Sequence, residues 1–472
     1  MKESKFIGRK LELDRLNALY NKKSLVVIKG RRRIGKSRLI NEFAKTRPFW
    51  NFAGLAPEEP MTAQDQRDYF ARQLSLLLKI PPLTFTDWAD AFEHLSFHIK
   101  PGDIVLLDEI SWMAQDDPTF IPKLKAWWDK QSTPVVLVLC GSVSIWIEEN
   151  ILKSTAFFGR INLTLTLEPL SIQESAELLK TIGVQSSDYE TYRLLSVLGG
   201  IPWYLTQIDP TISGDENIKR LAFEKDGLLV LEFDRIFHDL FNGKGTIYKK
   251  ILDALKEGTK TLKEIRQHIA FPHSGALSAF MQNLITAGFV EKGQLWSFKT
   301  HKALKQSLYR VSDPYLRFYL KVIEPHLDKI TLGEFKEVAI STIPGLNEHM
   351  GLQLESLLLQ NRPLLLKALG ITPIDIVRSG PYRQQASTTQ KGCQIDYLIQ
   401  TTTNTLFVCE FKFRKREISS DIIQEMQDKI SALKVPRGFA AVPVLFHLGG
   451  VSSAVATKSY FYRIIDIGDF LG

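Results

Sequence analysis

The sequence contains little cysteine and no segment suited to a membrane. Only 3 of its 472 residues are cysteine, and the wide spacing of Cys140, Cys393 and Cys409 excludes a zinc knuckle or a disulfide framework. This predicts a reducing, cytoplasmic location. The first twelve residues are too charged for a signal peptide. The uncharged stretch at residues 438–457 contains a proline, glycines and serines, so we predict no membrane anchor.

The overall composition is that of an ordinary globular protein. Hydrophobic residues make up 44% of the chain and charged residues 24%, which excludes a disordered or collagen-like chain. The length predicts about three domains. A formal net charge of +8 permits a polyanionic partner without requiring one.

Residues 30–37 fit the P-loop pattern G-x-x-x-x-G-K-[ST]. A β-branched run precedes them and an amphipathic segment follows, which predicts strand, loop and helix. In such a loop the Gly30 and Gly35 region cradles phosphate groups, Lys36 reaches the β and γ phosphates, and Ser37 ligates Mg²⁺. The three arginines inside the loop are interpreted as solvent-facing. The sequence therefore predicts binding of ATP with Mg²⁺.

A second apolar run, residues 104–107, ends in two carboxylates. Asp108 is predicted to hold Mg²⁺ through water, and Glu109 to polarise the water that attacks the γ-phosphate. Ser142 follows a third apolar run and could contact the γ-phosphate or simply cap a helix. Arg160 could stabilise charge in the transition state or be an ordinary surface cation.

Several motifs in residues 1–210 together resemble the archaeal-type ATPase family, a branch of the AAA+/STAND P-loop proteins. The motifs, in order, are residues 6–9 with 12–13, 30–37, 108–109, 139–142, 158–160 and 199–202. The resemblance implies that Arg9 and Pro202 belong to the nucleotide pocket, with Pro202 in a helical lid. It also implies that Ser142 is the sensor and Arg160 a candidate arginine finger, acting within its own chain or on a neighbouring copy in a homo-oligomer.

The middle of the chain predicts a winged helix-turn-helix. Three helices are expected at residues 247–256, 261–269 and 274–287, followed by short strands. The third helix offers only Gln282 and Asn283 for reading bases and has no cation, so a packing adaptor is favoured over sequence-specific DNA reading. The lysines at 292, 299, 302 and 305 could contact phosphates or be solvated.

Two strands near the C-terminus predict a hairpin that gathers charged side chains. Period-two alternation places Glu410 and Lys412 on one face, and Asp396 on the partner strand could join them. Such carboxylates can hold a divalent metal against a phosphodiester, with the lysine orienting water. Glu355, on a preceding helix, is a further candidate acid. The cations at 414–416 would suit a nucleic-acid backbone, and Gln424 and Gln427 could orient a phosphate or lie on the surface.

Together Glu355, Asp396, Glu410 and Lys412 resemble the PD-(D/E)XK nuclease fold, which is seen as the C-terminal domain of the same ATPase family. The resemblance implies a metal site at Glu355, Asp396 and Glu410, with Lys412 catalytic. Ile395 stands where the motif has proline. A domain that binds a protein or nucleic acid without cutting it stays open as the alternative.

The expected fold class is α/β: a P-loop NTPase with helical lid, a winged helix-turn-helix and a C-terminal restriction-endonuclease-like α/β domain. We expect an ATPase coupled to a Mg²⁺-dependent DNA nuclease, or a signalling ATPase that binds without cleaving. The expected segments are 1–212 (ATPase and lid), 213–245 (helical linker), 246–311 (winged helix), 312–345 (bridging helices) and 346–472 (nuclease-like).

Overall fold

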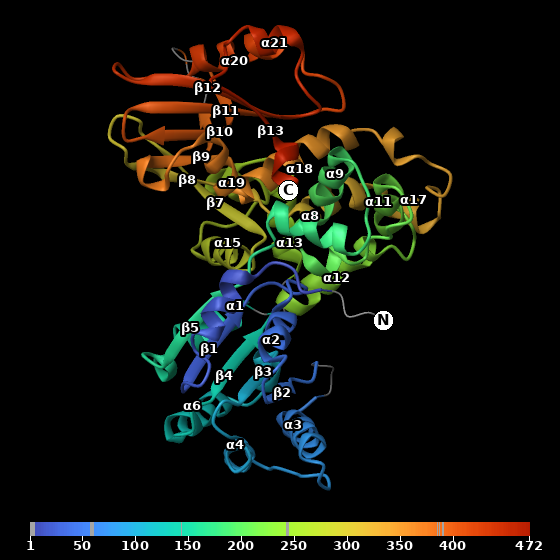
Figure 1. Cartoon of the computed structure of the whole chain (residues 1–472), viewed down its shortest axis with the longest axis vertical. Coiled ribbons are helices and arrows are strands. Elements are labelled where there is room, and N and C mark those ends of the chain that lie inside the picture. The colour runs from blue at the N-terminus through green and yellow to red at the C-terminus, as the bar shows by residue number, and fades with distance from the viewer. Residues whose placement is uncertain are drawn as a thin grey trace. The chain divides into compact units, whose positions relative to one another are not determined.

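The computed structural model describes residues 5–56, 61–142, 144–241, 245–384, 386, 388 and 391–472 (Figure 1). The chain forms two compact units. Unit 1 comprises Met1–Leu170 and Ile201–Trp203, and unit 2 comprises Ser171–Gly200 and Tyr204–Gly472. Residues 201–203 therefore belong to unit 1, whereas the residues on both sides of them belong to unit 2. Within the described residues no helix has both the length and the apolar character needed to cross a bilayer.

Unit 1 is built on a parallel five-stranded sheet in the order β2-β3-β4-β1-β5. The central strands are apolar and almost fully buried, as expected where helices cover both faces. The predicted α/β P-loop fold is confirmed for this unit. Its elements are α1 (Lys10–Asn17), β1 (Ser24–Lys29), α2 (Lys36–Ala44), β2 (Phe49–Ala53), α3 (Ala63–Leu78), α4 (Trp88–Ser96), β3 (Ile104–Asp108), α5 (Ile110–Met113), α6 (Phe120–Lys130), β4 (Val136–Gly141), α7 (Ser144–Ile147), η1 (Glu148–Leu152), η2 (Thr155–Phe157) and β5 (Ile161–Thr166).

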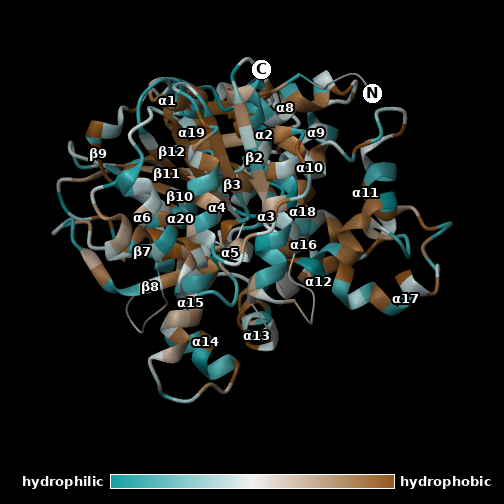
Figure 2. Cartoon of the chain, turned by 90° about the horizontal axis from the view of Figure 1, so that it is seen from below, coloured by the Kyte–Doolittle hydropathy of each residue, from teal (hydrophilic) through white to brown (hydrophobic). Residues whose placement is uncertain are grey.

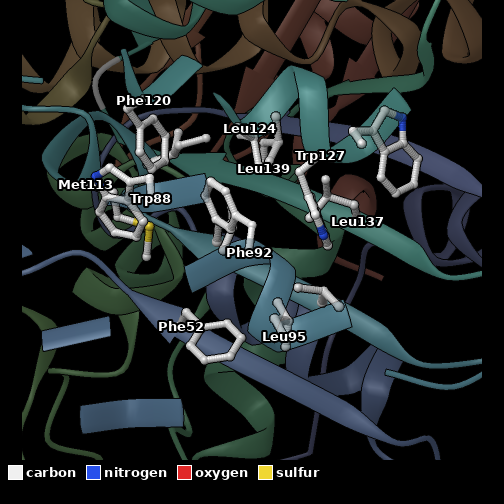
Figure 3. Packing of buried hydrophobic residues seen from close by; sticks show 14 of the residues in the cluster. Phe52, Trp88, Phe92, Leu95, Met113, Phe120, Leu124, Trp127, Leu137 and Leu139 are labelled. Carbon is white, nitrogen blue, oxygen red and sulfur yellow. The ribbon is translucent and has the colours of Figure 1, made fainter. Parts of the chain in front are cut away.

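An aromatic cluster fills the core on one side of this sheet (Figure 3). Trp88 packs edge-on against Phe120 with ring centroids 4.9 Å apart, and Phe92 stacks on Trp127 at 5.4 Å. Each such ring buries a large apolar area, so the cluster fixes α4 and α6 on the strands. This rigid base supports the loops at the carboxyl edge of the sheet.

Residues 171–200 belong to unit 2, although the sequence placed them with the ATPase domain. Helix α8 (Ile172–Thr181) begins where the Ile172 amide donates to Asn361 Oδ1 at 3.0 Å. From helix α9 (Asp188–Leu198), the Tyr192 hydroxyl donates to the Ile467 carbonyl at 2.6 Å, and Tyr189 stacks on Phe413 at 4.8 Å. These helices are thus bonded to the C-terminal part of the chain.

A bridging set of helices follows. It comprises α10 (Pro202–Leu205), whose first two residues lie in unit 1, α11 (Gly214–Ala222), α12 (Leu228–Phe241), α16 (Pro314–Phe318), η3 (Tyr319–Ile323), η4 (Glu324–His326), α17 (Leu327–Thr331), η5 (Ile340–Thr342), α18 (Leu346–Gln360) and α19 (Arg362–Leu369).

A small helical module with a three-stranded sheet, ordered β6-β8-β7, lies between these helices in sequence. Its strands β7 and β8 form a hairpin, and Trp296 and Phe298 at the hairpin's end are part of the core of the C-terminal sheet. The elements are α13 (Gly245–Leu255), β6 (Lys260–Thr261), α14 (Leu262–His268), α15 (Ala276–Thr286), β7 (Val290–Trp296) and β8 (Ala303–Val311).

The C-terminal sheet has the order β13-β12-β11-β10-β9. Strands β9, β10 and β11 are antiparallel, whereas β11 runs parallel to β12 through the crossover helix α20. Tyr397 pairs with Cys409, so the same register places Asp396 opposite Glu410. The elements are η6 (Pro373–Asp375), β9 (Ile376–Gln384), β10 (Cys393–Thr401), β11 (Thr405–Phe413), α20 (Asp421–Ala432), β12 (Ala440–Leu448), α21 (Ser453–Thr457), β13 (Arg463–Asp466) and η7 (Ile467–Leu471).

Candidate functional sites

The loop between β1 and α2 has the backbone shape that a phosphate-binding loop requires. Gly35 has φ +94° and a Cβ at Gly30 would lie 2.9 Å from the Leu167 carbonyl oxygen, so both positions need glycine. The buried Lys36 ammonium donates to the carbonyls of Gly30 at 2.9 Å and Arg31 at 3.1 Å. The loop therefore curls around the lysine, and its amides precede a helix N-terminus, where anions bind.

Two hydrogen-bonded pairs lie at the carboxyl ends of β3 and β4. Ser37 Oγ donates to Asp108 Oδ2 at 2.7 Å, which brings together the two groups predicted to hold Mg²⁺. Glu109 Oε2 accepts from both the amide and the hydroxyl of Ser142, each at 2.9 Å. The Ser142 hydroxyl thus orients Glu109. Glu109 itself has φ +50°, a strained conformation common at functional sites.

Arg9 and the segment around Pro202 both lie against the loop. Arg9 is buried, and its Nη2 donates to the carbonyl oxygens of Glu168 at 2.6 Å and Ile34 at 3.3 Å. A Cβ on Gly35 would lie 3.9 Å from Pro202 Cγ. Arg9 and Pro202 therefore touch the P-loop backbone, and their contact with a nucleotide stays a prediction.

Arg33 does not point to solvent as we expected of the loop arginines. Its guanidinium lies over the ring of Trp203, 3.4 Å from the centroid. This cation–π contact ties the loop to the short segment that unit 1 takes from between two parts of unit 2. The sequence carried no local signal for it, because the two residues are 170 positions apart.

Arg160 lies at the edge of the sheet opposite the P-loop. It precedes β5, and Ile161 pairs with Leu25 at the start of β1, whereas the P-loop follows the end of β1. Five strand residues separate the two edges, about 17 Å. Arg160 instead forms a two-point ion pair with Asp129, Nε to Oδ1 at 2.6 Å, and holds the pKa of Asp129 well below its usual range. In this arrangement Arg160 pairs with Asp129, and a role as an arginine finger stays a prediction.

A charged cluster in unit 2 gathers the predicted C-terminal residues. The Lys412 ammonium lies 3.0 Å from Glu410 Oε1 and 2.8 Å from Glu425 Oε2. Lys429, from the crossover helix, lies 2.5 Å from Glu410 Oε2. Burial lowers the pKa of Lys412, but the charge of Glu410 and the hydrogen bonds to both acids outweigh it and raise the pKa. Glu410 and Lys412 therefore converge as expected, and Lys429 joins them.

Asp396 and Glu355 complete this carboxylate–lysine centre. Asp396 Oδ2 accepts from the Phe411 amide at 2.9 Å. Burial, with the charges of Glu410 and Glu355, raises the pKa of Asp396 to about 8. Burial also raises the pKa of Glu355, against the opposing charges of Arg310 and Arg317. Glu410 and Glu355 thus lie close enough to Asp396 to disfavour its ionisation.

Two buried arginines flank Glu355 from the other side. Arg317 Nη1 donates to Ser356 Oγ at 2.6 Å and Arg310 Nη1 to the same oxygen at 3.2 Å. Arg310 also forms an ion pair with Glu291 at 2.6 Å. This network links β8 and α16 with the helix that carries Glu355, so the small module and the centre are mechanically joined.

The structure gives no ready-made metal site and no role for two predicted glutamines. In the described part of the chain, no group of three His, Cys, Asp or Glu side chains is arranged to hold a metal ion. Gln424 and Gln427 are exposed, and Gln424 Nε2 donates to Asp428 at 3.0 Å. Lys429, on the same helix, was not predicted as part of the centre. Its position in the sequence does not show which face of α20 packs against β11.

Residues 22–176 match the family of AAA domains. An uncharacterised protein of Methanocaldococcus jannaschii is 28% identical over 361 residues, covering 74% of this chain and 75% of that protein. A Walker-type ATPase of Pyrococcus abyssi is similar in structure with a TM-score of 0.49 and 18% identity, covering 67% of this chain and 96% of that one. The ORC2 protein of Aeropyrum pernix has a TM-score of 0.45 and 13% identity, covering 71% and 98%. The matched residues contain the loop and both hydrogen-bonded pairs, so this part of unit 1 is similar to AAA domains.

The raised pKa of Asp396 predicts how stability depends on pH. An exposed aspartate titrates near about 4, so between pH 4 and about 8 the unfolded chain ionises this group while the folded chain keeps it protonated. The wild type therefore loses stability over this range, by at most about 1.4 kcal/mol per pH unit. Asp396→Asn removes the effect, so its stability advantage grows from pH 5 to pH 8.

Urea unfolding of unit 2 in EDTA, from pH 5 to pH 9, measures this advantage. Asp428→Asn, at an exposed acid on α20, is the control and shows no such trend. A difference between Asp396→Asn and wild type that stays constant with pH would contradict the electrostatic account of the centre.

Proposed function

We propose that this AAA-type ATPase hydrolyses ATP to control a C-terminal domain that resembles PD-(D/E)XK nucleases and cleaves DNA with Mg²⁺. The pairing of Ser37 with Asp108 and of Glu109 with Ser142 carries the ATPase part. The convergence of Asp396, Glu410 and Lys412 supports the C-terminal part.

At the ATP site each side chain has a separate task. Mg²⁺, held by Ser37 and Asp108, would neutralise charge on the phosphates. Lys36 exchanges the carbonyls of its own loop for phosphate oxygens, which offer an ammonium stronger hydrogen bonds. Glu109, held by two donors from Ser142, orients and polarises the attacking water.

The nucleotide state reaches unit 2 along the chain. Trp203 and Pro202 contact Arg33 and Gly35 of the loop, and Gly199 and Gly200 connect them directly to α9. A change in the loop on phosphate binding therefore acts on the segment that ends α9. Helix α9 stacks on Phe413 through Tyr189, next to Lys412 in sequence. This route, which combines side-chain contacts with the chain at residues 199–203, couples ATP to the carboxylate–lysine centre.

The donors of the carboxylate–lysine centre are of the kind that a divalent metal binds, although the described side chains are not arranged around a metal position in this structure. Asp396, Glu410 and Glu355 supply carboxylate oxygens, the ligands that Mg²⁺ prefers, and a cation would relieve the repulsion that raises the pKa of Asp396. The Lys429 ammonium stands in for that cation at Glu410 Oε2. Bound metal would polarise the scissile phosphate and its attacking water. Lys412 holds or orients that water.

A second candidate function is binding without cleavage. Both oxygens of Glu410 are already paired, with Lys412 and with Lys429, so this carboxylate is neutralised without a metal. In this version ATP turnover switches a C-terminal domain that holds DNA or a protein. A homo-oligomer would give Arg160 a role on a neighbouring copy.

We interpret α13, α14, α15 and the sheet β6-β8-β7 as a winged helix that serves as a packing adaptor. Trp296 at the end of its hairpin donates from Nε1 to Gln400 Oε1 at 2.7 Å, and both are buried. The wing is therefore anchored in the C-terminal sheet and is not free to enter a DNA groove.

The ATPase proposal predicts separable effects at the loop and the acid pair. Lys36→Ala weakens binding of ATP at least tenfold, because it removes the cation that contacts the phosphates. Glu109→Gln keeps binding but lowers kcat by about 10²–10³, since it loses the polarising charge. Titration with a fluorescent ATP analogue and phosphate release measure the two effects.

Lys45→Ala, at an exposed lysine just after α2, is the matched control and leaves both quantities unchanged. Undiminished turnover in Glu109→Gln would refute the assignment of the acid.

The nuclease proposal predicts Mg²⁺-dependent nicking of supercoiled DNA by the wild type. Glu410→Gln and Lys412→Met each lose it by at least about 10²-fold. Lys429→Met lowers the Mg²⁺ concentration needed for half-maximal activity several-fold, because the competing ammonium is gone. Lys434→Met, at an exposed lysine after the same helix, leaves it unchanged. No nicking or cutting of supercoiled, linear or single-stranded DNA with Mg²⁺ or Mn²⁺ would leave the binding function in its place.

A further inference from the structure

Most of the chain's net positive charge lies in the small module. Residues 259–310 contain eight Lys and Arg but two Asp and Glu, a surplus of six out of the total of eight. Both acids are engaged. Glu264 accepts from the amide that begins α14, and Glu291 is shared between Arg310 and Arg362. The remaining cations of residues 259–310 are thus not neutralised by acids of the same stretch.

Five lysines of residues 259–310 are exposed. One lies on β7, three follow at the turn of the hairpin and along β8, and the fifth lies on α14, which is drawn largely teal in Figure 2. Across the described residues none of the five has an ion pair with an acid. They are Lys263, Lys292, Lys299, Lys302 and Lys305.

The edge strand β9 adds two exposed arginines to the same region. Arg378 Nε lies 3.4 Å from the carbonyl oxygen of His301 in the hairpin turn. Arg383 Nη1 donates to the Thr259 carbonyl at 3.3 Å, just before α14. The backbone amide of Thr261 chiefly lowers the pKa of Glu264, and the charge of Arg383 lowers it further, so Arg383 lies near Glu264 at the start of α14.

The hairpin is held rigidly against the C-terminal sheet. Phe298 stacks on Tyr382 of β9 at 5.1 Å, and Gln400 bridges the hairpin by accepting from Trp296 Nε1 and donating to the Phe298 carbonyl at 2.9 Å. Fixing these elements holds the cations at set positions, which lowers the entropic cost of binding an extended anion.

We propose that the hairpin and β9 form a binding surface for the backbone of nucleic acid. This basic face consists of Lys299, Lys302, Lys305, Arg378 and Arg383. It gathers five exposed cations on neighbouring elements, which suits a series of phosphates.

The basic face reads charge and not base sequence. Helix α15, the expected reading helix, has no cation, and its Asn283 amide is bonded to the Tyr248 hydroxyl at 2.8 Å. A membrane surface fits less well, because it takes exposed aromatic anchors. In the described residues 290–311, Leu304 is the one large apolar side chain that is exposed.

If the basic face holds DNA for the C-terminal centre, this role rests on the proposed function. DNA binding by the face is nevertheless measured separately from cleavage. Fluorescence anisotropy of a labelled 30-base-pair duplex in EDTA, without ATP, gives Kd over a range of salt concentrations. The triple variant Lys299→Glu, Lys302→Glu, Lys305→Glu binds at least tenfold more weakly than wild type. The slope of log Kd against log salt falls by about 2–3, because about three phosphate contacts are lost.

A second triple variant, Lys225→Glu, Lys329→Glu, Lys336→Glu, changes the net charge equally at exposed sites elsewhere in unit 2. It stays within twofold of wild type. The proposal would be overturned if both triple variants bound DNA equally weakly, or if neither bound it more weakly than wild type. It would also be overturned if the first triple variant lost binding only to phosphatidylserine vesicles and kept its binding to DNA. Binding is measured in EDTA and cleavage in Mg²⁺, so failure of cleavage and failure of this surface give different results.

Discussion

The attachment of residues 201–203 to unit 1 is the constraint on which the account of coupling depends. Both flanking stretches belong to unit 2, yet Trp203 lies under Arg33 of the P-loop and Pro202 lies beside Gly35. The loop that binds phosphate is therefore bonded to the chain that ends α9. When a nucleotide binds, the lysine of a P-loop and the residues around it must rearrange. Residues 201–203 contact the loop, so this rearrangement acts on them directly.

The carboxylate–lysine centre also depends on a few contacts between distant parts of the chain. Three carboxyl groups are brought together by an antiparallel pair of strands and a helix, and their mutual repulsion is balanced by lysines from both sides. Repulsion of this kind stores free energy that a divalent cation, or a phosphate with its own counter-ions, can release. The arrangement is compatible with both cleavage and binding. The two functions differ in whether a metal ion displaces the Lys429 ammonium from Glu410.

The sequence predicted features that are contiguous or strictly periodic. The P-loop and the acid pair are local motifs, and the alternation of β11 placed Glu410 with Lys412. Features set by strand direction or crossover packing were not predictable. Only the parallel pairing of β5 with β1 shows which edge of the sheet Arg160 occupies. Lys429 reaches Glu410 through the crossover of α20.

The sequence also did not show to which folded unit some segments belong. Trp296 and Phe298 look like the tip of a wing, whereas they are buried in the C-terminal core. Residues 171–200 have the helical pattern of a lid, but the bonds of Ile172 and Tyr192 tie them to the C-terminal part. Such long-range pairings depend on shape complementarity that no single-chain pattern encodes.

Hydrogen exchange of the amides in α9 and β11, with and without a non-hydrolysable ATP analogue, tests the coupling most directly. The account predicts that the analogue changes protection in both elements of the wild type, and that Trp203→Ala abolishes this change while still binding the analogue. Protection in α9 and β11 that is unaltered by a bound analogue would contradict it, because the nucleotide signal would then end within unit 1.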